Sequence, residues 1–103
     1  MLKLILAFAL TATVASAQED PCGTMGEMAE KIMAIRQMGG NMSDLIGPLT
    51  AQPESAARDI AIAMVKDAYN QPRFDTPEFQ QSTIKDFRNG IEALCYAQMG
   101  ELQ

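Results

Sequence analysis

The sequence predicts an all-α fold: a small bundle of three main helices and one short helix, closed by one disulfide bond. Three observations lead to this prediction. Apolar residues recur at steps of three or four along most of the chain, which is the spacing of one helix face. Helix-start signals precede these segments, and no segment alternates as a half-buried strand would. The chain also holds two cysteines, Cys22 and Cys95, far apart in the sequence.

The first 17 residues have the three-part pattern of a secretion signal. Lys3 provides a positive start, residues 4–10 form an unbroken apolar run, and residues 15–17 are the A-x-A cleavage site Ala-Ser-Ala. The apolar run is far shorter than the roughly 20 residues that span a bilayer. We therefore expect cleavage after Ala17, a single helical domain over residues 18–103, and a periplasmic or secreted location without membrane attachment.

Export determines how the two cysteines are interpreted. An even cysteine count in an exported chain is typical of disulfide pairing, and two cysteines allow one intramolecular pair, Cys22 with Cys95. The chain has no Cys-x-x-Cys motif and no histidine, so a redox pair and a metal-ligand pair lack their usual support. The bond would close a loop of 74 residues, counting both cysteines. For such a loop, chain entropy predicts a stabilisation of about 4 kcal/mol.

The first helix is predicted from its start signals. Asp20 and Pro21 fit the N-cap and the first helical position, and Thr24 with Glu27 has the spacing of a capping box. Gly39-Gly40 is the expected stop, because the left-handed residue that ends a helix is most favourable as glycine. The buried face is expected to consist of Met28, Ile32, Ile35 and Met42, with Gly39 in the same register.

A short helix and a longer one follow. Ser43 is the expected cap of a segment over 44–46, which Gly47-Pro48 should end, leaving residues 47–53 as a loop. The longer helix is expected over 54–70. Its apolar residues spread over about 200° of the circumference, a width that suits a central helix packed on two sides. They are Ala57, Ile60, Ala61, Met64, Val65 and Ala68, with Ile62 and Tyr69 further round.

The last helix follows a break at Pro72 and begins at residues 76–78, where Thr-Pro-Glu supplies a cap, a first-position proline and an acid. Its apolar face keeps its phase through Gly90, so we expect one continuous helix in which Gly90 marks a close contact. Cys95 lies at the edge of this face, and its bond to Cys22 would join the start of the first helix to the end of the last. The face consists of Thr83, Ile84, Phe87, Ile91 and Leu94.

Residue types with common catalytic roles are missing or unsupported. Without histidine, the commonest general base and metal ligand are absent. The serines have no base nearby in sequence, and the carboxylates fall on predicted solvated faces or in a loop. We therefore expect no enzyme, no catalytic residue, no metal and no cofactor. Removing the signal leaves seven Lys and Arg against thirteen Asp and Glu, a net charge of −6, which disfavours nucleic acid as a partner.

Methionines suggest a different chemistry. Thioethers are soft ligands suited to Cu(I). On a helical wheel, Met28 and Met42 point into the apolar stripe, whereas Met33 and Met38 point away from it and from each other. We therefore expect the methionines to fill the core rather than to bind copper. The crowded set is Met25, Met28, Met33, Met38 and Met42.

Four residues are candidates for a partner surface: Tyr69, Arg73, Phe74 and Tyr96. Tyrosine and arginine are residue types that anchor protein interfaces. The alternative is that Tyr69 and Phe74 plug the gap between helices, while Arg73 pairs with an acid such as Asp75.

The stretch AYNQPRFDTPEFQQSTIKDFRNGIEALCY, residues 68–96, resembles small exported proteins of proteobacteria and their phages. In those proteins a Tyr-x-Gln-Pro-Arg turn leads into a Gln-Gln-containing helix that ends in Cys-Tyr. The resemblance covers about a third of the chain and implies a helical exported domain. It implies no activity, and no catalytic residue is carried over.

The function predicted from these observations is that of a non-enzymatic exported binding protein of the inhibitor, immunity or envelope-modifying type. Its partner would be a protein in the periplasm or the extracellular space. Two alternatives stay open at this point: a periplasmic stress chaperone, and a methionine-rich Cu(I) carrier.

Overall fold

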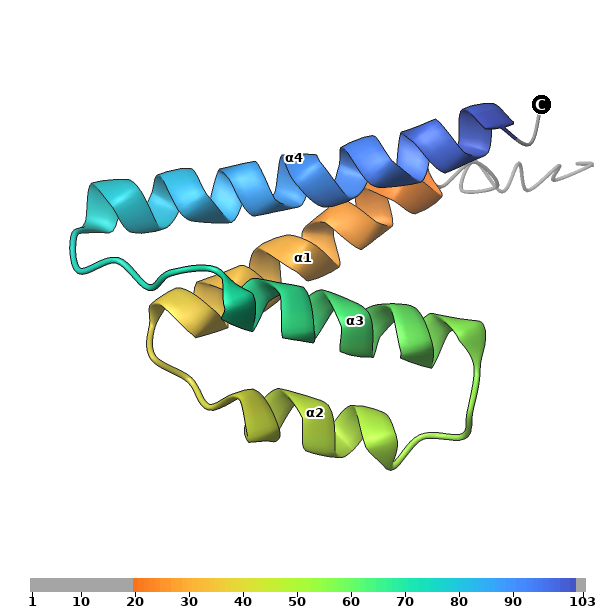
Figure 1. The fold of residues 1–103 in the computed structure, drawn as a ribbon, viewed down its shortest axis with the longest axis horizontal. Helices are drawn as coiled ribbons and strands as arrows, with labels where there is room; N and C mark the ends of the chain where they lie inside the picture. Colours follow the sequence, from red (N-terminus) through yellow and green to blue (C-terminus); the bar gives the residue numbers. More distant parts are fainter. Residues whose placement is uncertain (1–19, 102–103) are drawn as a thin grey trace, which may run out of the picture.

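A computed structural model describes residues 20–101, so the predicted secretion signal and its cleavage point lie outside the described residues. Within residues 20–101 the chain forms four α-helices and no strand. None of these helices is both long enough and apolar enough to cross a membrane. The predicted all-α fold of three main helices and one short helix is confirmed. The helices are α1 Pro21–Gln37, α2 Met42–Thr50, α3 Ala56–Asn70 and α4 Pro77–Glu101 (Figure 1).

The helix α1 is the centre of the arrangement. α4 runs antiparallel along it, α3 packs on another side of it, and α2 packs on the outer side of α3 (Figure 1). The predicted two-sided packing of α3 is therefore confirmed, since α3 lies between α1 and α2. α3 and α4 make few direct contacts with each other, because each is held mainly by α1.

The α1–α4 pair keeps one register from end to end. Each step of about one helical turn along α1 is matched by one turn backwards along α4. At one crossing a Cβ on Gly26 would overlap the Glu92 side chain, so glycine is what lets that side chain lie across α1. The pairs that define the register are Cys22 with Cys95, Gly26 with Glu92, Glu30 with Arg88, and Gln37 with Gln80.

The core lies where α1, α3 and α4 meet. Met33 is fully buried there, whereas Met28 is 42% exposed, so the wheel assignment of these two methionines was wrong. The reason is that α1 is covered by α3 and α4 on different sides, and its buried arc includes glycine, alanine and glutamine, which an apolar stripe does not mark. The core residues are Ala29, Ile32, Met33, Met64, Val65, Ala68, Ile84 and Phe87.

The two ends of α1 have the expected residues but not all the expected contacts. The Asp20 carboxylate accepts a hydrogen bond from the Cys22 N–H at 3.0 Å, as an N-cap should. The predicted capping box is wrong, because Thr24 lies inside the helix and donates its hydroxyl to the Asp20 carbonyl. Gly39 has φ of 86°, in the left-handed region, which confirms the predicted stop. Met42 consequently belongs to α2 rather than to the α1 face.

The predicted end of α2 at Gly47-Pro48 was wrong. The helix begins at Met42, after Asn41, and continues through Pro48 to Thr50. Pro48 removes one helical hydrogen bond. Because Pro48 is exposed and lies in the last turn of α2, that loss is tolerated. Thr50 donates its hydroxyl to the carbonyls of Ile46 and Gly47 and reinforces the last turn. The loop before α3 is therefore shorter than the predicted 47–53.

The helix α3 begins two residues later than predicted, and Ser55 caps it by accepting from the Arg58 N–H at 3.0 Å. The helix α4 begins at Pro77 and passes through Gly90 without a break, both as predicted. The predicted close contact at Gly90 was wrong, because no atom lies within 4 Å of the place its Cβ would take.

The predicted disulfide is present, with the Cα atoms of Cys22 and Cys95 5.4 Å apart. We expect replacement of both cysteines by alanine to lower the free energy of unfolding by about 4 kcal/mol, because the loop between them is then unconstrained in the unfolded chain. Urea denaturation at neutral pH, compared with the oxidised parent, measures this change. A loss below about 1 kcal/mol would show that the bond is not a main source of stability.

Candidate functional site

Tyr69, one of the four residues predicted as a partner surface, contacts the loop after α1. Its hydroxyl donates to the carbonyl oxygen of Gly40 at 2.6 Å. The Arg36 guanidinium lies 5.2 Å from the centre of its ring, and Arg36 also donates to the Gln71 carbonyl at 3.2 and 3.3 Å. Partial burial raises the pKa of Tyr69. These contacts hold the end of α3 against the end of α1.

Gln37, at the end of α1, organises the turn that follows α3, and the sequence analysis missed it. Its side chain is only 1% exposed. Its amide nitrogen donates to the Pro72 carbonyl at 2.9 Å, and its amide oxygen accepts from the Phe74 N–H at 2.9 Å. Its main-chain carbonyl accepts from Arg73 Nε at 3.0 Å. We call these four residues the Gln37 clamp. Pro72 was the available signal, since it stiffens a turn whose polar backbone groups need partners.

Of the three remaining candidates, Phe74 and Arg73 lie in the turn after α3. Phe74 is half-buried, and its ring centre lies 5.8 Å from that of Phe79, which is 59% exposed. Arg73, already held by Gln37, is also 4.0 Å from the Asp75 carboxylate, as the alternative prediction expected. Tyr69 and Arg73 thus contact α1 and its following loop, and Phe74 is left with one side toward solvent.

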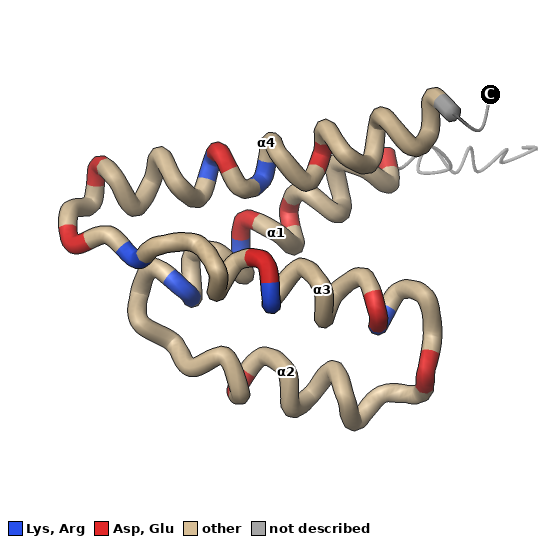
Figure 2. Tube along the Cα trace, viewed as in Figure 1, with Lys and Arg blue, Asp and Glu red and all other residues tan. Residues whose placement is uncertain are grey.

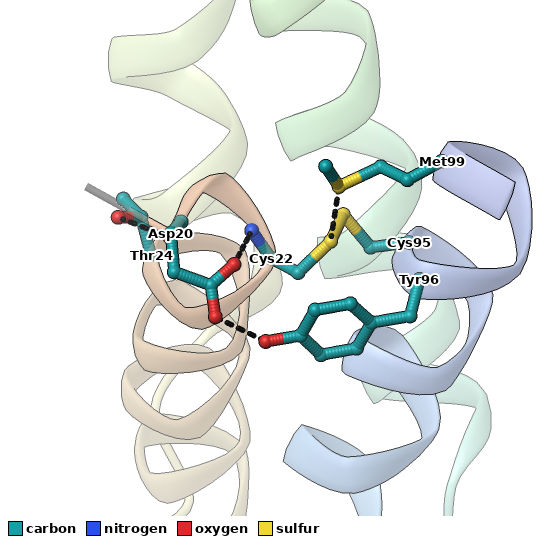
Figure 3. Close-up of a disulfide and its surroundings, with 6 residues drawn as sticks. All are labelled: Asp20, Cys22, Thr24, Cys95, Tyr96 and Met99. Atoms are coloured by element: carbon teal, nitrogen blue, oxygen red, sulfur yellow. Dashed lines mark hydrogen bonds between the residues drawn. A yellow bond between two sulfur atoms is a disulfide. The ribbon is translucent and has the colours of Figure 1, made fainter. Parts of the chain in front are cut away.

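Tyr96 lies at the opposite end of the domain, beside the disulfide (Figure 3). Its hydroxyl donates to the carboxylate of Asp20, the N-cap of α1. This hydrogen bond lowers the pKa of Asp20 and raises the pKa of Tyr96. The sulfur of Met99 lies 3.3 Å from the Cys22 sulfur. Because the disulfide-bonded Cys22 has no S–H, this is a sulfur–sulfur contact rather than a hydrogen bond.

A groove runs between α3 and α4, with α1 as its floor. Two adjoining hollows of about 360 and 400 Å³ form it, and they share Asp67, Ile91 and Leu94 in their walls. The first hollow reaches Phe74 at the turn, and the second reaches Cys95 at the disulfide. We call this feature the α3–α4 groove. It exists because α3 and α4 both pack on α1 and make few contacts with each other.

Apolar side chains on both walls of the α3–α4 groove are open to solvent. Leu94 of α4 is 64% exposed and Ile60 of α3 is 46% exposed. Both were predicted on buried faces, and these assignments were wrong. No helix of the described chain covers this stretch, because α3 lies against α1 rather than against α4.

Acidic and basic residues alternate along α3 and α4 without a long run of one sign (Figure 2). The α3–α4 groove differs from this pattern, because its charged lining residues are Asp67 and Asp86, one from each wall, with no lysine or arginine. On another side of α4, Arg88 bridges Glu30 of α1 and Glu92 at 2.5 and 2.9 Å. Hydrogen bonds to these two carboxylates raise the pKa of Arg88, and the bond to Glu92 has the larger effect.

The described residues offer no cluster of three or more His, Cys, Asp or Glu side chains for a metal ion. Three of the five methionines singled out from the sequence lie in different surroundings. Met33 is buried in the core, while Met28 and Met38 are 42% and 76% exposed.

Comparisons with known proteins add no further constraint: no family model matches this chain, and neither do the curated proteins or the solved structures that were compared with it.

The Gln37 clamp predicts a specific loss of stability. Gln37→Ala removes a buried side chain and leaves the partly buried Pro72 carbonyl and Phe74 N–H without their Gln37 partners, so we expect the free energy of unfolding to fall by about 1–3 kcal/mol. Gln81→Ala, at an exposed position of α4, is the matched control and should change it by less than about 0.5 kcal/mol. Chemical denaturation compares the two variants, and equal effects would contradict the role of the clamp.

The Asp20–Tyr96 pair predicts a pH dependence. Because the pKa of Asp20 lies below its ordinary value of 3.8, the bond should stabilise the fold above that value and be lost as pH falls through the lowered pKa. Because the pKa of Tyr96 lies above its ordinary value of 10.0, the alkaline loss should come only as pH rises through the raised pKa.

Tyr96→Phe tests this dependence. It should lower Tm between about pH 5 and 9. The difference from the parent should shrink as pH falls below 3.8, the ordinary pKa of Asp20, and through the lowered pKa. Thermal melts followed by circular dichroism across pH measure the difference. A gap that stays constant into acid would mean that packing of the ring, and not the hydrogen bond, is responsible.

Proposed function

We propose that this chain is an exported, non-enzymatic binding protein that holds a protein partner in the α3–α4 groove, as an inhibitor, immunity or envelope-modifying protein would. The observation that carries the proposal is the exposure of Leu94 and Ile60 on facing walls of one apolar groove. Small soluble domains seldom leave large apolar side chains grouped in a hollow unless something binds there.

Export is the second part of the proposal. A disulfide between Cys22 and Cys95 is compatible with an oxidising compartment, where such bonds persist. The signal pattern of residues 1–17 supports the same location, in the periplasm or outside the cell.

Pre-organisation favours a specific partner over many clients. The disulfide joins α1 to α4 at one end of the domain, and at the other end the Gln37 clamp holds the turn between α3 and α4 against α1. A groove whose walls are already in place loses little conformational entropy when a ligand enters. A stress chaperone usually gains from adaptable surface, and a Cu(I) carrier needs converging thioethers, so neither alternative has a specific observation in its favour.

Site-specific photocrosslinking tests the proposal. A benzoylphenylalanine residue is introduced at Leu94, and the protein is irradiated in the cells that export it. We expect one dominant protein adduct. The matched control is the same residue at Ser82, an exposed position of α4 in a different hollow, which should give no such adduct. Equal labelling from the two positions, or none from Leu94, would contradict partner binding in the α3–α4 groove.

A further inference from the structure

Gly90 is not explained by the fold of the chain. A glycine inside a helix costs about 1 kcal/mol relative to alanine. Its φ is not in the left-handed region, since among the described glycines only Gly39 has a positive φ. Beyond the backbone of its own helix, a Cβ at Gly90 would meet no atom within 4 Å. The same holds for Gly47 of α2 and Gly100 of α4, but of the three only Gly90 lines the α3–α4 groove. Gly26 shows the contrast, because the Glu92 side chain occupies the place of its Cβ.

The position of Gly90 connects it to the α3–α4 groove, whose wall it forms. On the facing helix, Ala63 is likewise small, exposed and part of the wall. Small residues let a helix approach more closely, since the distance between packed helices depends on the side chains at the contact. Apolar side chains follow directly along the same walls: Ile60, Ile91 and Leu94.

The groove has the length of a short helix. Its α4 wall extends from Thr83 to Gln98, which is about 22 Å at 1.5 Å per residue. About four turns of a second helix span the same distance, and such a helix presents apolar anchors at i, i+3 or i+4, and i+7.

The charge of the walls selects among such helices. Asp67 and Asp86 stand on opposite walls, and the lining contains no lysine or arginine. Carboxylates on both sides favour an occupant whose polar edges carry lysine or arginine, and they disfavour an acidic one.

We propose that the occupant of the α3–α4 groove is a basic amphipathic helix of a partner protein, and that Gly90 is the point of its closest approach. This inference rests on the proposed function, since it specifies the chemistry of the partner that the groove would hold.

Synthetic peptides test the charge part of the proposal with the chain of residues 18–103. One peptide is a leucine–lysine amphipathic helix, the second has glutamate in place of every lysine, and the third is a scrambled leucine–lysine sequence. Fluorescence anisotropy should show that the first binds at least about tenfold more tightly than the other two. Asp67→Asn with Asp86→Asn should remove most of this preference and weaken its salt dependence. Equal binding of the lysine and glutamate peptides would overturn the proposal.

Two variants of neighbouring residues test the role of Gly90. Gly90→Met places a side chain in the groove where no intramolecular contact opposes it, so the protein should fold and bind the basic peptide about tenfold more weakly. Asn89→Met, at an exposed position that lines a different hollow, should change binding less than about twofold. Circular dichroism and thermal melting confirm that both variants are folded. Undiminished binding by Gly90→Met would overturn the assignment of Gly90.

Other occupants give different results. If sedimentation shows a dimer and Gly90→Met makes it monomeric, a second copy of the chain fills the groove. If the parent binds anionic vesicles and Gly90→Met does not, the occupant is a lipid surface. Either result would overturn the proposal. If Leu94 still crosslinks to one protein while the peptides show no charge preference, the proposed function stands and this inference fails. If the peptides behave as expected and Leu94 gives no adduct, the groove chemistry stands and the proposed function fails.

Discussion

The antiparallel pairing of α1 with α4 is the constraint on which the rest of the structure depends. It is fixed covalently at one end by Cys22 and Cys95. At the other end Gln80 of α4 donates to the main-chain carbonyl of Gln37, whose buried amide also holds the turn before α4. Between these points the register is kept by close packing at Gly26 and by the ion pair between Arg88 of α4 and Glu30 of α1. In a domain with so small a core, two distant fixed points resist sliding and fraying better than packing alone.

The open groove follows from this pairing. α1 must cover α4 along its length, so α3 is left with another side of α1. The Gln37 clamp then holds the turn after α3 at the end of α1, which keeps α3 from moving across to cover Leu94. The same contacts that stabilise the fold therefore maintain an uncovered apolar surface, and this is how structure and proposed function are linked in so short a chain.

Local chemistry made much of the fold predictable from sequence. Asp20-Pro21, Gly39 and Pro77 mark helix ends through capping and backbone preference, which act within a few residues. The disulfide followed from composition and compartment. What could not be predicted depends on contacts between distant segments: the burial of Met33 and Gln37, the exposure of Met28 and Leu94, and the continuation of α2 through Pro48. Periodicity shows that a helix has an apolar face, but not which neighbour, if any, covers it.

The candidate site shows the same division. Sequence reasoning chose Tyr69, Arg73, Phe74 and Tyr96 for their residue types, and of these only Phe74 lines the α3–α4 groove. The most informative position is instead Gly90, a helical glycine without a neighbouring side chain that lines the α3–α4 groove. Folding accounts for Gly26 through the Glu92 side chain, whereas nothing among the described residues occupies the space beside Gly90. Local rules are broken most often at functional positions, with compensation elsewhere in the chain, and Gly90 breaks one on the wall of the groove that the fold leaves open.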